Sequence, residues 1–99
     1  MLFLVVSSPN PDKPSEIVEQ RRKYWPWAQD KLDKGLARFF HARVGRGAVA
    51  IFDVGSNEIL HSILNEWSEM VPAKFEVYPL IDSDAIKSFL DDPTPSWEF

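Results

Sequence analysis

The sequence predicts an α+β domain in which strands and helices follow the order β-α-β-β-α-β. Short runs rich in Val, Ile, Leu and Phe stand near both ends of the chain and on either side of a glycine turn in the middle. Two longer stretches between these runs repeat their apolar residues every three or four positions, as amphipathic helices do. The chain has 99 residues, of which 44% are hydrophobic and 26% charged, so we expect one folded globular domain.

The first half of the chain is expected to form a strand and then a helix. The apolar run 1–6 has the composition of a buried strand, and the Ser-Ser-Pro cluster after it is typical of a turn that ends a strand. The helix is expected to begin near Asp12, with Asp12 or Ser15 as its cap. Gly35 is suited to end it, because glycine readily adopts the left-handed conformation found after helices.

One proline falls inside this predicted helix. Pro26 has no amide hydrogen and crowds the preceding turn, so we expect a kink or split between Tyr24 and Trp27. Together with Trp25, these aromatic side chains would form a flat apolar wall suited to a planar ligand. A role in the core or in a dimer contact fits the same residues equally well, because a small domain needs large side chains to fill its interior.

The second half of the chain is expected to add a hairpin, a helix and a last strand. Two β-type runs over 36–44 and 48–54 are separated by three residues, the spacing of an antiparallel hairpin. Ser56 is placed to cap a helix whose apolar residues form one stripe. The remaining elements follow in order: a strand from about 74 to 81, a short helix over 83–90 and an extended tail over 92–99.

This order of elements predicts a ferredoxin-like fold over residues 1–91, in which an antiparallel sheet carries its helices on one face. The other face of the sheet would then be uncovered. The first strand and the strand over 48–54 carry apolar side chains on both faces, so the uncovered face is expected to pack against a second copy of the chain. The sequence therefore predicts a homodimer.

Composition argues against several classes of function. Fifteen acidic and eleven basic residues give a net charge of −4, which opposes binding to a phosphate backbone. The apolar start is too short to span a membrane and lacks the basic residues of a signal peptide, so neither is expected. The absence of cysteine suits a reducing cytoplasm. Two histidines and scattered acids form no metal-binding motif, so no metal site is expected.

The strand over 36–44 carries candidate catalytic side chains. Strict alternation would place His41 and Arg43 on one face of the sheet and Arg38 on the other. Histidine titrates near neutrality, which suits His41 to act as a general base, and either arginine could hold an anion. Structural roles are also open: His41 as an ordinary strand histidine, and Arg38 as a surface residue paired with Asp53 or Glu76.

Two further side chains complete the candidate site. Arg21 lies one turn before Trp25 and could extend over its ring or toward the mouth of a pocket. Tyr78 on the last strand could donate a proton or bind an oxyanion. Half-buried strand tyrosines are common, so a structural role for Tyr78 is equally compatible with the sequence.

A set of scattered residues forms a family-like pattern: Met1, Leu2, Phe3, Val5, Gly35, Arg38, Phe52, Asp53, Val54, Ser56, Glu58, Leu60, His61, Glu76 and Val77. This pattern resembles that of the muconolactone delta-isomerase family over most of positions 1–82. The resemblance implies a dimeric α/β barrel, which can assemble into a ring of dimers. It also implies a cofactor-free shift of a double bond in a small unsaturated lactone that carries a carboxylate. The family's acidic residue on the first helix has no counterpart over 22–27, and Leu4 replaces a family histidine.

The leading hypothesis is a cytoplasmic, cofactor-free isomerase that acts by proton transfer on a small anionic ring compound. The residues assigned to it are His41, Arg38 and Tyr24 in catalysis, and Trp25, Trp27, Arg21, Arg43 and Tyr78 in substrate binding. One alternative is a cofactor-independent monooxygenase of the antibiotic-biosynthesis type, which would act on a polycyclic substrate. Another is a non-catalytic module that binds a small ligand.

Overall fold

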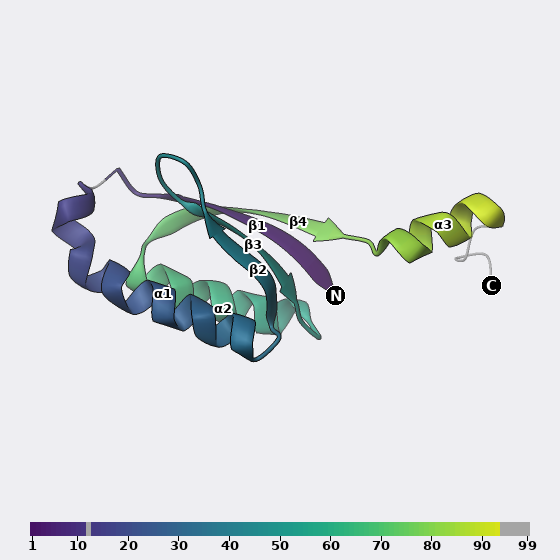
Figure 1. Ribbon diagram of the computed structural model, residues 1–99, viewed down its shortest axis with the longest axis horizontal. Helices are drawn as coiled ribbons and strands as arrows, with labels where there is room; N and C mark the ends of the chain where they lie inside the picture. The colour runs from purple at the N-terminus through teal and green to yellow at the C-terminus, as the bar shows by residue number, and fades with distance from the viewer. Residues whose placement is uncertain (12, 94–99) are drawn as a thin grey trace.

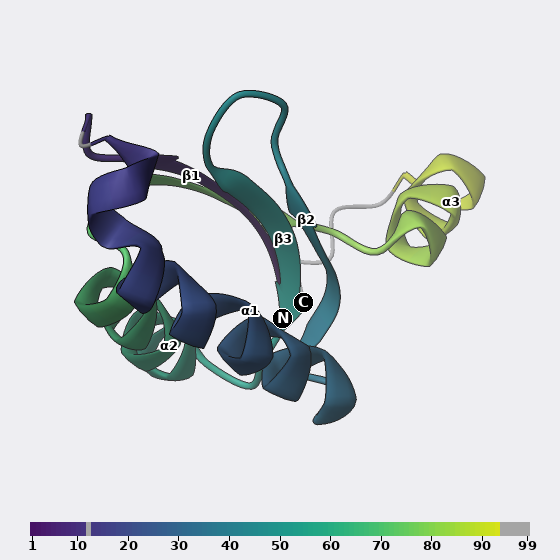
Figure 2. The same cartoon turned by 60° about the vertical axis from the view of Figure 1, so that its left-hand side comes forward.

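The computed structural model describes residues 1–11 and 13–93, and it confirms the ferredoxin-like α+β fold (Figure 1). The elements in chain order are β1 (Leu2–Pro9), the 3-10 turn η1 (Pro14–Ile17), α1 (Val18–Asp33), β2 (Ala37–Ala42), β3 (Ala48–Asp53), α2 (Asn57–Met70), β4 (Ala73–Leu80) and α3 (Ser83–Asp91). The four strands form one antiparallel sheet in the order β2-β3-β1-β4. Helices α1 and α2 lie on one face of this sheet (Figure 2).

Strand β1 is longer than expected, because it continues through the Ser-Ser-Pro cluster to Pro9. It lies in the middle of the sheet, where Ser7 is opposite Ala48 of β3 and Phe75 of β4. The Ser7 hydroxyl accepts a hydrogen bond of 2.9 Å from the Ala48 amide. Pairing on both sides outweighs the weak strand preference of serine, which is why the sequence signal for a turn was misleading.

Helix α1 is one continuous element through Pro26, so the expected split is wrong. Pro26 and Arg22 lie on the exposed side of the helix, where water can bind the Arg22 carbonyl that proline leaves without its usual partner. The irregular part of the helix is its start, where η1 precedes it and Ile17 has φ −120°. Ser15 lies inside η1 and caps neither element, while Asp12 is outside the described residues.

Strand β2 contains an irregularity at Arg38, which changes the faces that its side chains occupy. Ala37 and Phe40 are both buried on the helix side of the sheet, although strict alternation would separate them. Phe39 and His41 then lie on the other face. The expected alternation over 36–44 is therefore wrong at its start, and the strand is shorter than that run.

The core between the sheet and the two helices is mostly aromatic. Trp67 of α2 is 1% exposed, and its ring centroid lies 4.9 Å from that of Phe40, 5.1 Å from that of Phe75 and 5.3 Å from that of Tyr24. The predicted cap of α2 is confirmed, since the Ser56 hydroxyl accepts a hydrogen bond of 3.2 Å from the Ile59 amide. This core holds α1 at a fixed distance above the sheet.

The short helix expected over 83–90 is confirmed as α3. It lies beyond the end of β4 and apart from the layer formed by the sheet and the other helices (Figures 1 and 2). Residues 94–99 of the expected tail are outside the described part of the chain. Within that part, every helix is too short or too polar to cross a lipid bilayer.

Candidate ligand-binding cavity

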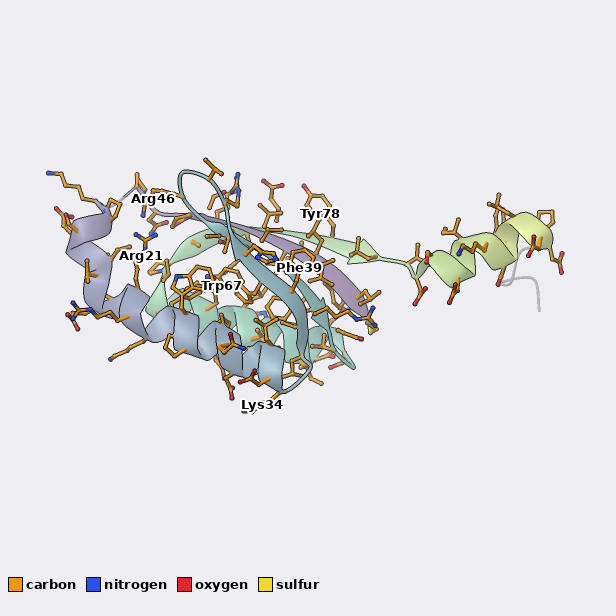
Figure 3. All side chains as sticks on the ribbon, viewed as in Figure 1. Arg21, Lys34, Phe39, Arg46, Trp67 and Tyr78 are labelled. Atoms are coloured by element: carbon orange, nitrogen blue, oxygen red, sulfur yellow. The ribbon has the colours of Figure 1, made fainter. Side chains whose placement is uncertain are left out.

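A cavity of about 160 Å³ lies between α1, the end of α2 and the loop that joins β2 to β3. Its lining residues are Ser7, Pro9, Ile17, Arg21, Tyr24, Trp25, Ala42, Arg43, Gly45, Arg46, Gly47, Ala48, Trp67 and Val71. Figure 3 shows Arg21 on α1 and Arg46 on the loop at the same end of the molecule, far from α3. The cavity therefore opens at the end of the sheet opposite to that helix.

Three arginines make the cavity strongly cationic. Arg21 comes from α1, while Arg43 and Arg46 come from the loop between β2 and β3. Arg43 is held by hydrogen bonds from its Nη1 to the Ser7 carbonyl oxygen at 3.0 Å and to the Ser8 hydroxyl at 3.1 Å. Asp, Glu and His are all missing from the described lining residues. Guanidinium groups so arranged favour a carboxylate or a similar anion.

Aromatic rings form one wall of the cavity. The ring centroid of Tyr24 lies 5.0 Å from that of Trp25 and 5.3 Å from that of Trp67, with both pairs in inclined rather than parallel contact. Tyr24 and Trp67 are almost fully buried, whereas Trp25 is 42% exposed and so stands where the cavity meets solvent. Such a wall suits a flat, weakly polar ring.

The hydroxyl group of Tyr24 is the unusual polar atom of this wall. It is buried, and it makes no hydrogen bond with any described residue. Burial raises the pKa of the Tyr24 phenol, so the group stays protonated at neutral pH. A buried hydroxyl without a partner costs free energy, which a ligand oxygen that accepts a hydrogen bond from it would recover.

The loop between β2 and β3 reaches the cavity because of its glycines. Gly45 has φ 93° and Gly47 has φ 101°, a region that residues with a Cβ rarely adopt. A Cβ built on Gly47 would lie 2.2 Å from the carbonyl oxygen of Ser7, so the loop can touch β1 only with glycine at this position. The Arg43 amide donates a 2.9 Å hydrogen bond to the Gly47 carbonyl and closes the loop. This closure places Arg43 and Arg46 beside β1.

The sequence was then compared with known families. Residues 1–92 match the family described as "Domain of unknown function (DUF3303)". This chain belongs to the DUF3303 family. A comparison with curated proteins gave no significant match.

The DUF3303 chain is similar in structure to 5-chloro-2-hydroxyhydroquinone dehydrochlorinase (TftG) from Burkholderia phenoliruptrix AC1100, solved in complex with 2,5-dihydroxybenzoquinone. The TM-score is 0.69 and the sequence identity 15%, over 82% of this chain and 94% of that one. This similarity supports the ferredoxin-like fold that the muconolactone isomerase resemblance implied. It extends to the fold alone, because the identity is low.

The cavity of this DUF3303 chain brings together half of the predicted site residues. Arg21, Tyr24, Trp25 and Arg43 line it, whereas Arg38, Trp27, His41 and Tyr78 do not. Alternation had placed Arg43 on the same face as His41. Arg43 follows the end of β2, so this alternation does not extend to it, and its side chain lines the cavity. The predicted aromatic wall is present, but a continuous helix presents it.

Arg38 is paired with Asp53, one of the structural roles considered for it from the sequence. Its Nη2 lies 2.7 Å from a carboxylate oxygen of Asp53 on the neighbouring strand. The hydrogen bond from Arg38, with a smaller contribution from the charged amino group of Met1, holds the pKa of Asp53 below its usual range. This ion pair lies outside the cavity.

Three other predicted residues are also used elsewhere. The Trp27 indole nitrogen donates a 2.8 Å hydrogen bond to a Glu66 carboxylate oxygen, which ties α1 to α2. His41 stacks on Phe39, with ring centroids 5.4 Å apart, on the face of the sheet away from the helices. The Tyr78 hydroxyl donates to Glu76, which is also exposed on β4. His41 therefore cannot serve as the base in this cavity.

Sequence reasoning identified four of the fourteen described lining residues and missed the other ten, among them Ser7, Arg46 and Trp67. Ser7 was assigned to a turn, Trp67 to the apolar stripe of its helix, and Arg46 to the turn of the hairpin. The available signal was the pair of glycines around Arg46, which indicated a loop with unusual backbone angles. The described residues contain no group of three or more His, Asp or Glu side chains that could hold a metal ion.

Proposed function

We propose that this chain binds a small ring-shaped carboxylate in the cavity and acts on it by cofactor-free proton transfer, as an isomerase would. The observation that carries the proposal is the combination of three arginines, a neutral buried phenol and an aromatic wall around one small space. Each of these parts has a role that such a substrate requires.

The size of the cavity supports a single ring. A cavity of roughly 150 Å³ in another protein holds one benzene molecule, and the space here is about 160 Å³. The solved complex of TftG, which contains 2,5-dihydroxybenzoquinone, is a precedent for a single-ring ligand on this fold. The size argues against the polycyclic substrate that a monooxygenase of the antibiotic-biosynthesis type would require.

The charges of the cavity support an anionic substrate. A carboxylate can accept parallel hydrogen bonds from one guanidinium group, and such charge-assisted bonds are stronger than neutral ones. Arg21 and Arg46 face the same space from two different elements, so they could hold one carboxylate between them. Arg43 is bonded to β1 and would contribute mainly its positive charge.

Tyr24 is suited to the chemical step. A double-bond shift removes a proton from one carbon and returns a proton to another, and the ring carbonyl oxygen carries the negative charge in between. The protonated Tyr24 hydroxyl would donate a hydrogen bond to that oxygen. Because the described lining residues include no base, the proton would leave to water at the open mouth of the cavity.

The same lack of a base favours a second candidate function, a non-catalytic module that binds a small aromatic acid. The arginines and the aromatic wall would serve this function without change. The two candidates differ only in whether a product is formed, so binding and turnover have to be measured separately.

The uncovered face of the sheet supports a homodimer as part of this proposal. Its apolar side chains are Leu2, Leu4, Val6, Phe39, Val49, Ile51, Tyr78 and Leu80, and the polar residues His41, Asp53, Lys74 and Glu76 share the face with them. A cluster of apolar side chains bordered by polar ones is typical of an interface. We propose that two copies pack these faces together and form a dimeric barrel.

Binding is tested by calorimetric titration with benzoate and with its neutral analogue benzamide. We expect benzoate to bind and benzamide to bind at least about 10-fold more weakly, since each charge-assisted bond is worth roughly 1.5–3 kcal/mol. Arg21→Gln should weaken benzoate binding by roughly 10- to 100-fold for the same reason. Lys23→Gln removes an equal charge from the exposed side of α1 and should have no effect. Equal affinity for the two ligands would contradict the proposal.

Turnover is tested by following muconolactone in D2O by proton NMR. An isomerase would exchange or move its ring protons, and Tyr24→Phe would slow this by roughly 100-fold or more, as the loss of an oxyanion donor does in other enzymes. Tight binding of benzoate without any change in muconolactone would favour the non-catalytic module.

A further inference from the structure

The polar groups that line the cavity differ in whether the folded chain already uses them. The Ser7 hydroxyl accepts a 2.9 Å hydrogen bond from the Ala48 amide and lies 3.4 Å from the Ala48 carbonyl oxygen. The Ser7 carbonyl oxygen accepts a 3.0 Å hydrogen bond from the Nη1 of Arg43. The Tyr24 hydroxyl, in contrast, is buried and has no hydrogen-bond partner among the described residues. Of these groups, it is therefore the one whose hydrogen bond is left for a ligand.

The ring of Tyr24 is held in place by the aromatic side chains around it. Its centroid lies 5.0 Å from that of Trp25, 5.3 Å from that of Trp67 and 5.8 Å from that of Phe40, and the residue is 5% exposed. A ring packed on several sides cannot turn its hydroxyl out to water. The cost of leaving this hydroxyl unpaired therefore persists as long as the cavity is empty.

Tyr24 lies deeper in the molecule than the arginine that precedes it on α1. Arg21 is three residues earlier, on the same side of the helix and nearer its start, and it is only half-buried. Figure 3 shows Arg21 and Arg46 nearer the end of the molecule than Trp67, whose ring packs against Tyr24. A ligand whose carboxylate binds the arginines would therefore turn the opposite side of its ring toward Tyr24.

The surroundings of Tyr24 favour a neutral oxygen on the ligand. Burial raises the pKa of the Tyr24 phenol, because a negative charge at this depth is poorly solvated. The same burial would disfavour a second negative charge on a ligand there. A ring hydroxyl or a ring carbonyl can accept a hydrogen bond from Tyr24 without carrying a charge. The cavity thus has a cationic end and a neutral polar end.

We propose that Tyr24 selects, among ring carboxylates, those that carry a neutral oxygen on the side of the ring opposite to the carboxylate. This inference rests on the proposed function and deepens it by naming the second substituent of the ligand, and it holds whether or not a product is formed. A ring with an apolar group at that position would leave the Tyr24 hydroxyl unpaired. Sites built to form a hydrogen bond discriminate strongly against an analogue that cannot form it.

Calorimetric titration with 4-hydroxybenzoate and 4-methylbenzoate tests this selection, because the hydroxyl and methyl groups are similar in size. The wild type should bind 4-hydroxybenzoate roughly 3- to 10-fold more tightly than 4-methylbenzoate. Tyr24→Phe removes only the hydroxyl and should reverse this order, since the ligand hydroxyl then becomes the unpaired group. Tyr78→Phe is the matched control: it removes a hydroxyl from an exposed residue of β4 outside the cavity and should keep the order of the wild type.

Benzoate, titrated in the same series, separates this inference from the proposed function. If benzoate binds but 4-hydroxybenzoate is not preferred over 4-methylbenzoate, or is preferred equally in Tyr24→Phe, the selection by Tyr24 is overturned and the proposed function stands. Failure of all three ligands to bind would overturn both.

Thermal unfolding of the empty protein provides a second measurement. Tyr24→Phe should melt at or above the temperature of the wild type, because it removes a buried hydroxyl that has no partner among the described residues. A clearly lower melting temperature would show that the hydroxyl is already bonded in the empty protein, and this would contradict the selection.

Discussion

The two glycines of the loop between β2 and β3 have similar backbone angles but different surroundings. A Cβ on Gly45 would meet nothing within 4 Å, whereas a Cβ on Gly47 would lie 2.2 Å from the Ser7 carbonyl oxygen. The close approach at Gly47 holds the loop against β1 and thereby places Arg43 and Arg46 at the cavity. Single residues thus determine where the charges of the site lie.

Gly47→Ala is expected to destabilise the fold more than Gly45→Ala. Both substitutions force a side chain into a left-handed conformation, at a cost of roughly 1–2 kcal/mol. Gly47→Ala must also displace the backbone of β1, which brings its total to roughly 3 kcal/mol or more. Unfolding in urea, followed by circular dichroism, measures both losses. Equal losses in the two variants would show that the loop does not press on β1.

At the scale of elements, the position of α1 above the sheet determines the shape of the cavity. Glu66 of α2 accepts a hydrogen bond from the Trp27 indole and lies 3.4 Å from the Lys31 ammonium group. The hydrogen bond from Trp27 and the charge of Lys31 lower the pKa of Glu66. This pair of contacts holds the two helices together on the side away from the loop.

The lowered pKa of Glu66 predicts how stability depends on pH. A carboxylate whose pKa is lower in the folded state stabilises the fold above its unfolded pKa, near 4.3, and this contribution is lost as the pH falls through that value. Glu66→Gln should therefore reduce the difference in unfolding free energy between pH 7 and pH 3. Glu69→Gln, on the exposed side of the same helix, should leave that difference as in the wild type. A smaller pH dependence in Glu69→Gln than in Glu66→Gln would contradict this assignment.

The elements were largely predictable from the sequence, while the faces of their side chains were less so. The spacing of apolar residues and the cap at Ser56 indicate α2 correctly, because local hydrogen bonds and one buried stripe determine that helix. The irregularity at Arg38 depends on pairing with β3, and a single chain segment carries no signal for it. It put Ala37 on the same face as Phe40, while His41 shares with Phe39 the face away from the cavity. The candidate site was therefore only partly predicted.

At the scale of the whole molecule, half of the sheet surface and all of α3 face solvent in one chain. Burial of the sheet face by a second copy would remove this apolar surface from water, which is the main force in most associations. The homodimer was expected from the apolar residues of β1 and β3. In the structure, part of these residues lie on the face away from the helices, which is why the homodimer is proposed. The cavity is lined by residues of a single chain.

If the uncovered sheet face forms the dimer interface, two substitutions of isoleucine by lysine should affect the oligomeric state differently. Ile51→Lys places a charge on the uncovered face of β3, and Ile59→Lys places one on the exposed side of α2. In sedimentation velocity, the wild type and Ile59→Lys should sediment as dimers of the 11.4 kDa chain. Ile51→Lys should shift to the monomer, because an unpaired charge in an apolar interface is costly. A monomeric wild type would contradict the interface.

Binding of an anionic ring in the cavity is tested most directly by side-chain NMR. Benzoate is titrated into protein labelled with nitrogen-15, and the Nε–H signals of the arginines and the Nε1–H signals of the tryptophans are followed. We expect saturable shifts at Arg21, Arg46 and Trp25, with little change at Arg38, which is paired with Asp53 outside the cavity. Shifts confined to Arg38, or no saturable shift at the cavity arginines, would contradict binding in the cavity.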